Sequence, residues 1–146
     1  MRLTVTLSGV DTVSLRTKAL IAAARRGLSD GLSEGAQVLV TEAQAIVPVD
    51  TGHLRDSIHA ELVEATDTRI SVVVTPAFDE PNKWGFEPAY ARRIEYGFVG
   101  QDSLGRNYHQ AAQPYMRPAW DAKVDEVRQT VKDHVLEELD AEMSRR

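Results

Sequence analysis

The sequence predicts an α+β fold, in which a small, mainly antiparallel sheet packs with a long N-terminal helix and a long C-terminal helix. Two long stretches, about Leu15 to Ile46 and Pro118 onward, repeat apolar residues at three- to four-residue spacing, as amphipathic helices do. Two shorter stretches between them alternate apolar and polar residues, as half-buried strands do. With 146 residues, 42% of them hydrophobic, the chain suits one domain over 1–146 with a modest core.

Composition argues against several classes of protein. The chain has no cysteine, so it can form neither a disulfide nor a thiolate metal site, and it has no apolar run long enough to span a membrane. Its first residues, Met1 to Leu7, alternate apolar and polar and lack the apolar core of a signal peptide, which predicts a cytoplasmic protein. A formal net charge of -5 makes broad wrapping of nucleic acid by a basic surface unfavourable.

The N-terminal part of the chain is expected to hold one strand and one helix. Leu3, Val5 and Leu7 alternate with polar residues, which predicts a half-buried strand over 2–8. The helix that follows, over about 15–46, is expected in one or two pieces.

A stripe of three glycines, Gly27, Gly31 and Gly35, marks one face of this helix at four-residue spacing. Glycine weakens a helix, so one interpretation is a weak or kinked helix. The other interpretation is that the missing side chains let a neighbouring helix pack closely.

The first helix is expected to end at a corner over 47–58. Pro48 ends it because proline fixes its own φ and disfavours helical geometry in the residue before it. Asp50 or Thr51 can then cap a short helical turn, and Gly52 can let another backbone come close. The apolar residues expected to share one face of this turn are Leu54 and Ile58.

A hairpin and a long loop are expected next. The alternating runs at 58–62 and 70–75, joined by 64–68, predict an antiparallel hairpin. The segment 76–88 holds three prolines and is long for a connection, and such loops are usually functional or disordered. Its aromatic residues favour a loop that docks on its own domain or on a partner, and they form our candidate interface loop: Phe78, Trp84 and Phe86.

The last third is expected to hold two helices around an irregular segment. Tyr90 to Gly97 predicts a short helix that ends at Gly97, and the polar, glycine-rich run 100–107 predicts a mobile segment. Pro114 and Pro118 bracket the start of the final helix. Its apolar stripe is Val124, Val127, Val131, Val135, Leu139 and Met143.

No strong catalytic or metal-binding pattern occurs. The sequence has no phosphate-binding glycine loop, no nucleophile elbow and no His-Glu-x-x-His motif, and His109 and His134 stand alone. His53, Asp56 and His59 could supply metal ligands, as in a small metal-dependent hydrolase. A helical turn followed by a strand need not bring the two histidines together, so surface histidines are the preferred interpretation.

The remaining charged and apolar patterns favour assembly. Arg92 and Arg93 with Glu95 are interpreted as solvated charges or as one side of an intersubunit ion pair, and the acid-rich stretch 121–142 as a solvated helix face. Two long helices and a small sheet carry more apolar surface than one core needs, which predicts an oligomer.

Three stretches together resemble a known family. The first is a Pro-x-Asp-Thr-Gly followed by Leu-Arg-x-Ser-Ile at 48–58, the second a Tyr-Ala block at 90–97, and the third a Pro-aromatic-aliphatic-Arg-Pro at 114–118. In order and spacing they resemble the tail-component or neck protein family of long-tailed bacteriophages of the Hong Kong 97 type, over roughly residues 15–140. The motif residues, to which we assign structural or assembly roles, are Pro48, Asp50, Thr51, Gly52, Leu54, Ser57, Ile58, Tyr90, Ala91, Ile94, Glu95, Tyr96, Gly97, Pro114, Tyr115, Arg117 and Pro118.

The resemblance implies a virion structural protein, with no enzymatic activity and no cofactor, assembled in the host cytoplasm. It implies a role at the head-proximal end of the tail, in tail completion and head-tail joining, as a homo-oligomeric ring of six subunits. Its expected partners are the phage connector, terminator and tail-tube proteins, with no membrane contact. The genome would pass through without specific binding, which suits an acidic ring.

Within this ring, segments 76–88 and 98–113 are expected to order on assembly. Strand 2–8 could pair with the sheet edge of a neighbouring subunit. One alternative is a tail terminator that caps the tail tube. From other classes, the alternatives are the metal-dependent hydrolase and a host-directed binding protein, monomeric, that docks a partner through 76–88.

Overall fold

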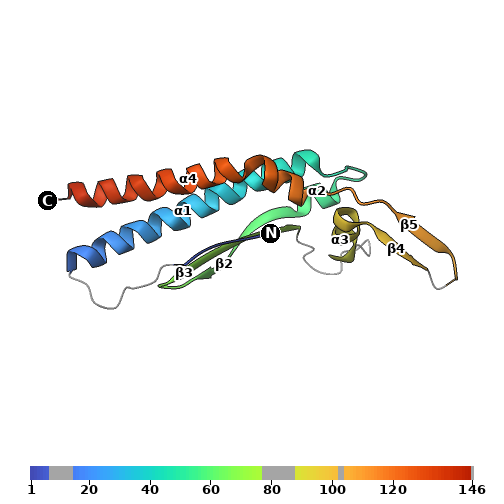
Figure 1. Cartoon of the computed structure of the whole chain (residues 1–146), viewed down its shortest axis with the longest axis horizontal. Coiled ribbons are helices and arrows are strands. Elements are labelled where there is room, and N and C mark those ends of the chain that lie inside the picture. The colour runs from blue at the N-terminus through green and yellow to red at the C-terminus, as the bar shows by residue number, and fades with distance from the viewer. Residues whose placement is uncertain (7–14, 77–87, 102–103, 146) are drawn as a thin grey trace.

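Two long antiparallel helices and a small sheet make up the body of the protein (Figure 1). The computed structural model describes residues 1–6, 15–76, 88–101 and 104–145. Helix α1 (Leu15–Ile46) lies between helix α4 (Met116–Ser144) on one side and the sheet on the other. This three-layer arrangement confirms the predicted α+β class, and α1 is one continuous helix.

The glycine stripe of α1 is the surface on which α4 packs. A Cβ atom at Gly31 would lie 2.7 Å from the Cα atom of Val131, and one at Gly27 would lie 2.6 Å from the carbonyl oxygen of His134. The helices therefore approach so closely that no side chain fits between them. The close-packing interpretation of the stripe is confirmed, and the cost of glycine to the helix is offset by backbone contact with α4.

The sheet has three strands in the order β1-β3-β2, and both pairings are antiparallel. The strands are β1 (Arg2–Thr6), β2 (Ile58–Ala65) and β3 (Arg69–Pro76), so the predicted hairpin is confirmed. Strand β1 pairs with β3 of its own chain, Leu3 opposite Val72, which corrects the suggestion that this strand seeks a neighbouring subunit. The pairing places Leu3 in the core, and this burial favours the intramolecular partner.

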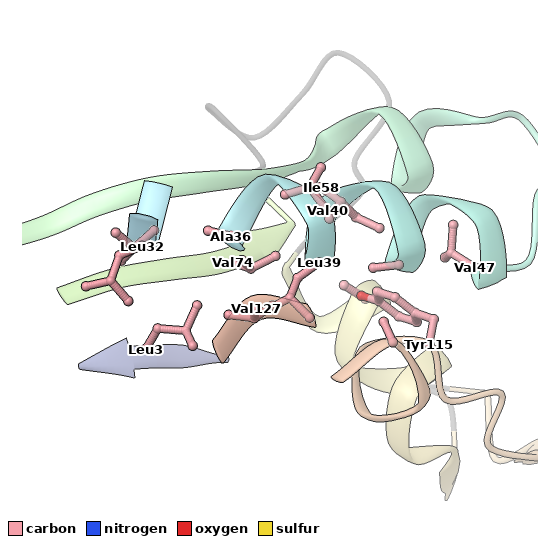
Figure 2. Close-up of a cluster of buried hydrophobic side chains, with 14 of the residues drawn as sticks. Leu3, Leu32, Ala36, Leu39, Val40, Val47, Ile58, Val74, Tyr115 and Val127 are labelled. Carbon is pink, nitrogen blue, oxygen red and sulfur yellow. The ribbon is translucent and has the colours of Figure 1, made fainter. Parts of the chain in front are cut away.

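The core forms where α1, the sheet and the start of α4 meet, as Figure 2 shows. Apolar side chains of α1 pack against Ile70, Val72 and Val74 of the central strand. Helix α4 contributes two buried residues, Ala119 and Val127, and packs mainly against α1. Its predicted apolar stripe is therefore only partly buried toward the C-terminal end, where Met143 is 52% exposed.

Four shorter elements complete the described fold: α2 (His53–Ser57), α3 (Pro88–Tyr96), β4 (Phe98–Gln101) and β5 (Asn107–Gln110). The prediction of an irregular segment over 100–107 is wrong at its ends, because β4 and β5 pair as an antiparallel hairpin with Val99 opposite His109; residues 104–106 between them are irregular as predicted. The alternation over 58–62 is also imperfect: a bulge between Leu62 and Glu64 shifts the register, and Leu62 is exposed at the sheet edge.

Candidate assembly site

The first motif block forms the corner between α1 and the sheet. Gly52 precedes α2 with a φ of 85°, in the left-handed region that favours glycine. Neither Asp50 nor Thr51 caps α2, so that prediction is wrong: Gly52 occupies the N-cap position, and no side-chain hydrogen bond is made there. Gly52 also does not admit another backbone, since the atoms around its missing Cβ belong to the side chains of Arg55 and Asp56.

The other residues of this block attach the corner to the core. Leu54 and Ile58 are both buried, as predicted from their spacing. The Gln44 side chain of α1 donates a hydrogen bond to the Ile58 carbonyl at 3.1 Å, and the Ser57 hydroxyl donates to the Leu54 carbonyl at 2.7 Å. Pro48 lies partly buried just after the helix end. These contacts fix the angle between α1 and β2.

The second and third blocks meet at one carboxylate, that of Glu95 near the end of α3. Its Oε2 atom accepts hydrogen bonds from the backbone N–H groups of Tyr115 at 2.8 Å and Met116 at 3.0 Å. Its Oε1 atom accepts from the N–H group of Arg117 at 3.2 Å. The first N–H groups of a helix have no intrahelical partner, and a negative charge is favoured there by the helix dipole.

Glu95 therefore caps α4 from a separate helix. The residue at the N-cap position, Tyr115, makes no side-chain cap itself. The interpretation of Glu95 as a solvated charge or half of an intersubunit pair is wrong, because its oxygens are occupied by the backbone of α4. Arg92 and Arg93 of the same helix do remain exposed.

Apolar burial reinforces the junction between α3 and α4. Ala91, Ile94 and Tyr115 are buried in the core, and the N–H group of Gln113 donates to the Ile94 carbonyl at 2.8 Å. Tyr115 is 1% exposed. Burial, followed by the nearby charge of Glu95, raises the pKa of Tyr115 to about 12, so its hydroxyl stays protonated over the neutral range.

The rest of these two blocks lies toward the surface or at the turn. Gly97 ends α3 with a φ of 75°, and a Cβ there would lie 2.8 Å from the carbonyl oxygen of Gln110. The predicted helix stop is confirmed, and it also admits the end of β5. Tyr90 is partly buried against the core. The exposed or partly exposed motif residues are Tyr96, Pro114, Arg117 and Pro118.

Beyond Gly97, the chain forms a hairpin arm, which we define as the described residues 98–101 and 104–110. The arm extends from one end of the molecule (Figure 1). At its base the guanidinium of Arg93 lies over the Phe98 ring, 4.5 Å from the ring centre. Val99 and Leu104 are strongly exposed. The arm is a two-stranded ribbon, a structure that is only marginally stable on its own. The sequence pattern missed the arm because its strands are short and of mixed polarity.

The candidate metal ligands His53, Asp56 and His59 do not form a site. Asp56 accepts a hydrogen bond from the Arg55 side chain at 2.7 Å, and Nδ1 of His59 lies 3.1 Å from the Ser57 carbonyl. Among the residues that the structure describes, no group of three or more His, Asp or Glu side chains could hold a metal ion. The aromatic residues of the candidate interface loop, Phe78, Trp84 and Phe86, lie outside the described residues.

Comparison with known families connects this geometry to a biological role. Residues 16–97 match the family model described as "Bacteriophage HK97-gp10, putative tail-component". The chain belongs to this HK97-gp10-like family. The match includes the corner and α3, and it ends well before Met116, where α4 begins. Neither the curated proteins nor the solved structures gave a match.

Family membership makes the protein a bacteriophage tail component, and thus a part of the virion that contacts other phage structural proteins. The geometry agrees with a mechanical role. The corner and the Glu95 junction fix the sheet, α3 and α4 relative to one another, and the arm extends from α3. In the described ranges, no helix is both long and apolar enough to cross a membrane.

Proposed function

We propose that the protein completes the phage tail at its head-proximal end and joins the tail to the DNA-filled head, as a ring of six subunits. The family match over residues 16–97 carries this proposal, since it assigns the body of the chain to phage tail components. The whole chain, 1–146, acts in it as one domain. The subunits contribute structure and no catalysis.

The charge of the chain supports a position around the genome. Its formal net charge is -5, so a ring of such subunits repels the phosphate backbone and lets DNA pass without being held. The partners in this proposal are connector, terminator and tail-tube proteins, and assembly takes place in the host cytoplasm. The motif residues serve it indirectly, because the Glu95 junction holds the arm and α4 in a fixed relation.

A phage that lacks this chain tests the proposal. We expect filled heads and separate tails of normal length in electron micrographs of the lysate, and joined virions once the purified protein is added. Tails of excessive length would instead identify a terminator that caps the tail tube. Fully joined virions that fail to adsorb to cells would contradict the proposal in favour of a host-directed binding protein.

A further inference from the structure

The arm is attached to the body of the protein at a narrow base. A Cβ atom at Gly97 would lie 2.8 Å from the carbonyl oxygen of Gln110, where β5 ends. The N–H group of Gln113 donates to the Ile94 carbonyl at 2.8 Å. These two contacts hold together the points at which the chain enters and leaves the arm. They fix where the arm begins, and they leave its direction to other contacts.

The strands of the arm receive little support from the rest of the fold. Strands β4 and β5 pair with each other, and their contacts with the helices and with the three-stranded sheet are few. Figure 1 shows the arm extending away from the body beside α3. A ribbon held in this way can pivot about its base, unless a side chain outside the ribbon holds it in place.

One aromatic ring supplies such a contact between the arm and α3. Phe98 is the first residue of β4 and is half-buried, although it lies outside the described hydrophobic core. The guanidinium of Arg93, in the last turn of α3, lies 4.5 Å from the centre of its ring. A cation over the face of an aromatic ring is attracted by the negative charge of that face. The contact therefore links the first strand of the arm to the helix before it.

Gly100 leaves the space that the Phe98 ring occupies. Its φ lies outside the left-handed region, so its backbone conformation does not require glycine. A Cβ atom at Gly100 would collide with the Cζ atom of Phe98 and would lie 3.0 Å from both Cε atoms of the ring. Glycine inside a strand often marks a close approach of this kind. The missing side chain at Gly100 thus lets the ring lie along β4, where Arg93 reaches it.

We propose that Arg93, Phe98 and Gly100 form a latch that holds the arm in one direction relative to α3. The Arg93 side chain is exposed, and a cation–π contact at an exposed site is weak, so the latch opens readily. With the latch open, the arm pivots about its base. The exposed side chains of Val99 and Leu104 then lose their fixed direction.

The latch prepares the arm for contact with a partner. A segment that is already held in one orientation loses less conformational freedom on binding, and the cost of binding is lower by that amount. The inference goes beyond the proposed ring, because it concerns the single chain and applies to any partner that the arm meets.

The experiment measures the direction of the arm with two spin labels. The chain has no cysteine, so two introduced cysteines are the only labelled sites. Leu104→Cys places one label in the turn of the arm, where the side chain is 75% exposed, and Gln37→Cys places the other on an exposed position of α1. Labelled protein is diluted with unlabelled protein, so that distances between copies do not contribute. Pulsed electron paramagnetic resonance should then give one narrow distance distribution.

Two variants open the latch in different ways. Arg93→Gln removes the cation, and Gly100→Ala places a methyl group where the end of the ring lies. A cavity of about 330 Å³, lined in part by Arg93, Phe98 and Tyr108, gives the displaced ring space, so the fold should stay intact. The distance distribution should broaden in both variants, with the ratio of latched to open arms lower by about two- to fivefold, as expected for an exposed cation–π contact.

Arg92→Gln is the matched control. Arg92 is the neighbouring residue of α3 and is also exposed, and its side chain is not part of the latch. Removing its charge should leave the distance distribution equal to that of the wild type. Circular dichroism should show all three variants folded, which separates a pivoting arm from an unfolded chain.

Three results would overturn the latch. A wild-type distribution as broad as that of Arg93→Gln would show that the contact does not hold the arm. Equal broadening by Arg92→Gln would assign the effect to the charge of α3 and not to the ring contact. A narrow distribution in both latch variants would show that the base alone fixes the direction. The proposed ring would stand in each case, because the mass in solution tests it separately.

Discussion

Replacing Gly31 with alanine should destabilise the protein, although the same change stabilises most helices. Gly31 lies in the middle of α1, where a Cβ atom would meet the Cα atom of Val131 at 2.7 Å and the Cβ atom of His134 at 3.2 Å. The nearest of these atoms belongs to the backbone of α4. No rotamer change can relieve the contact, so the two helices must move apart along their length.

The magnitude follows from two opposing terms. Alanine is favoured over glycine in a helix interior by about 1 kcal/mol, and overpacking a well-filled interface costs about 1–3 kcal/mol. Since the clash is with backbone, we expect the upper part of that range and a net loss of about 1–2 kcal/mol in the free energy of unfolding. Urea denaturation followed by circular dichroism measures this loss directly. Thermal unfolding should show a decrease in Tm of about 2–4 °C per kcal/mol.

Two variants of the same helix serve as controls. At Gly35 the nearest atom to a new Cβ is Cγ1 of the Val127 side chain at 2.9 Å, so Gly35→Ala should cost less than Gly31→Ala. Gln37 is exposed, and Gln37→Ala should leave stability within about 0.5 kcal/mol. A Gly31→Ala protein more stable than the wild type would refute the close packing of α1 on α4.

Four further predictions test other parts of the fold. Glu95→Ala should lower the free energy of unfolding by about 2 kcal/mol, because three N–H groups lose a charged cap, and Glu95→Gln should lower it by less. A urea denaturation curve equal to that of the wild type would contradict the capping of α4 by Glu95. Tyr115, one of the four tyrosines, should titrate near pH 12 by ultraviolet absorbance. Because its pKa is raised in the folded state, its contribution to stability is full below about pH 10 and falls toward pH 12. Tyr115→Phe should remove this pH dependence of stability. The hydrogen bond to Glu34, followed by the charges of Glu137 and Asp30, raises the pKa of His134. The His134–Glu34 ion pair therefore stabilises the fold at acid pH, and this contribution is lost as the pH rises through the pKa of His134. Glu34→Gln should lower the pKa of His134 measured by NMR. The proposed single domain predicts coincident unfolding transitions by far-ultraviolet circular dichroism and tryptophan fluorescence, and two separated transitions would argue against it.

Hydrophobic periodicity was sufficient to predict the body of the fold. The spacing of apolar residues along α1 and α4 reflects burial on one face, and the alternation in β3 reflects a strand with its core face on α1. The glycine stripe left two interpretations open, since the sequence alone does not say which element lies opposite it. The structure decides between them by placing α4 there.

The details that sequence reasoning missed depend on contacts between distant segments. The cap on α4 comes from Glu95, 20 residues before Tyr115, so no local capping pattern predicts it. Asp50 and Thr51 match such a local pattern and yet do not cap α2. The arm has short strands of mixed polarity, and its pairing depends on register and on Gly97 more than on periodicity. The motif blocks did include Glu95, although its role as a cap was not evident from residue type, whereas the helix stop at Gly97 was predicted.

Self-assembly is the central claim, and the mass of the purified wild-type protein in solution tests it most directly. Light scattering across a concentration series, with and without tail-tube protein, should give a ring-sized multiple of the 16.2 kDa subunit at high concentration or with the tube present. A mass that stays at one subunit at every concentration, and in the presence of tail-tube and connector proteins, would contradict the ring.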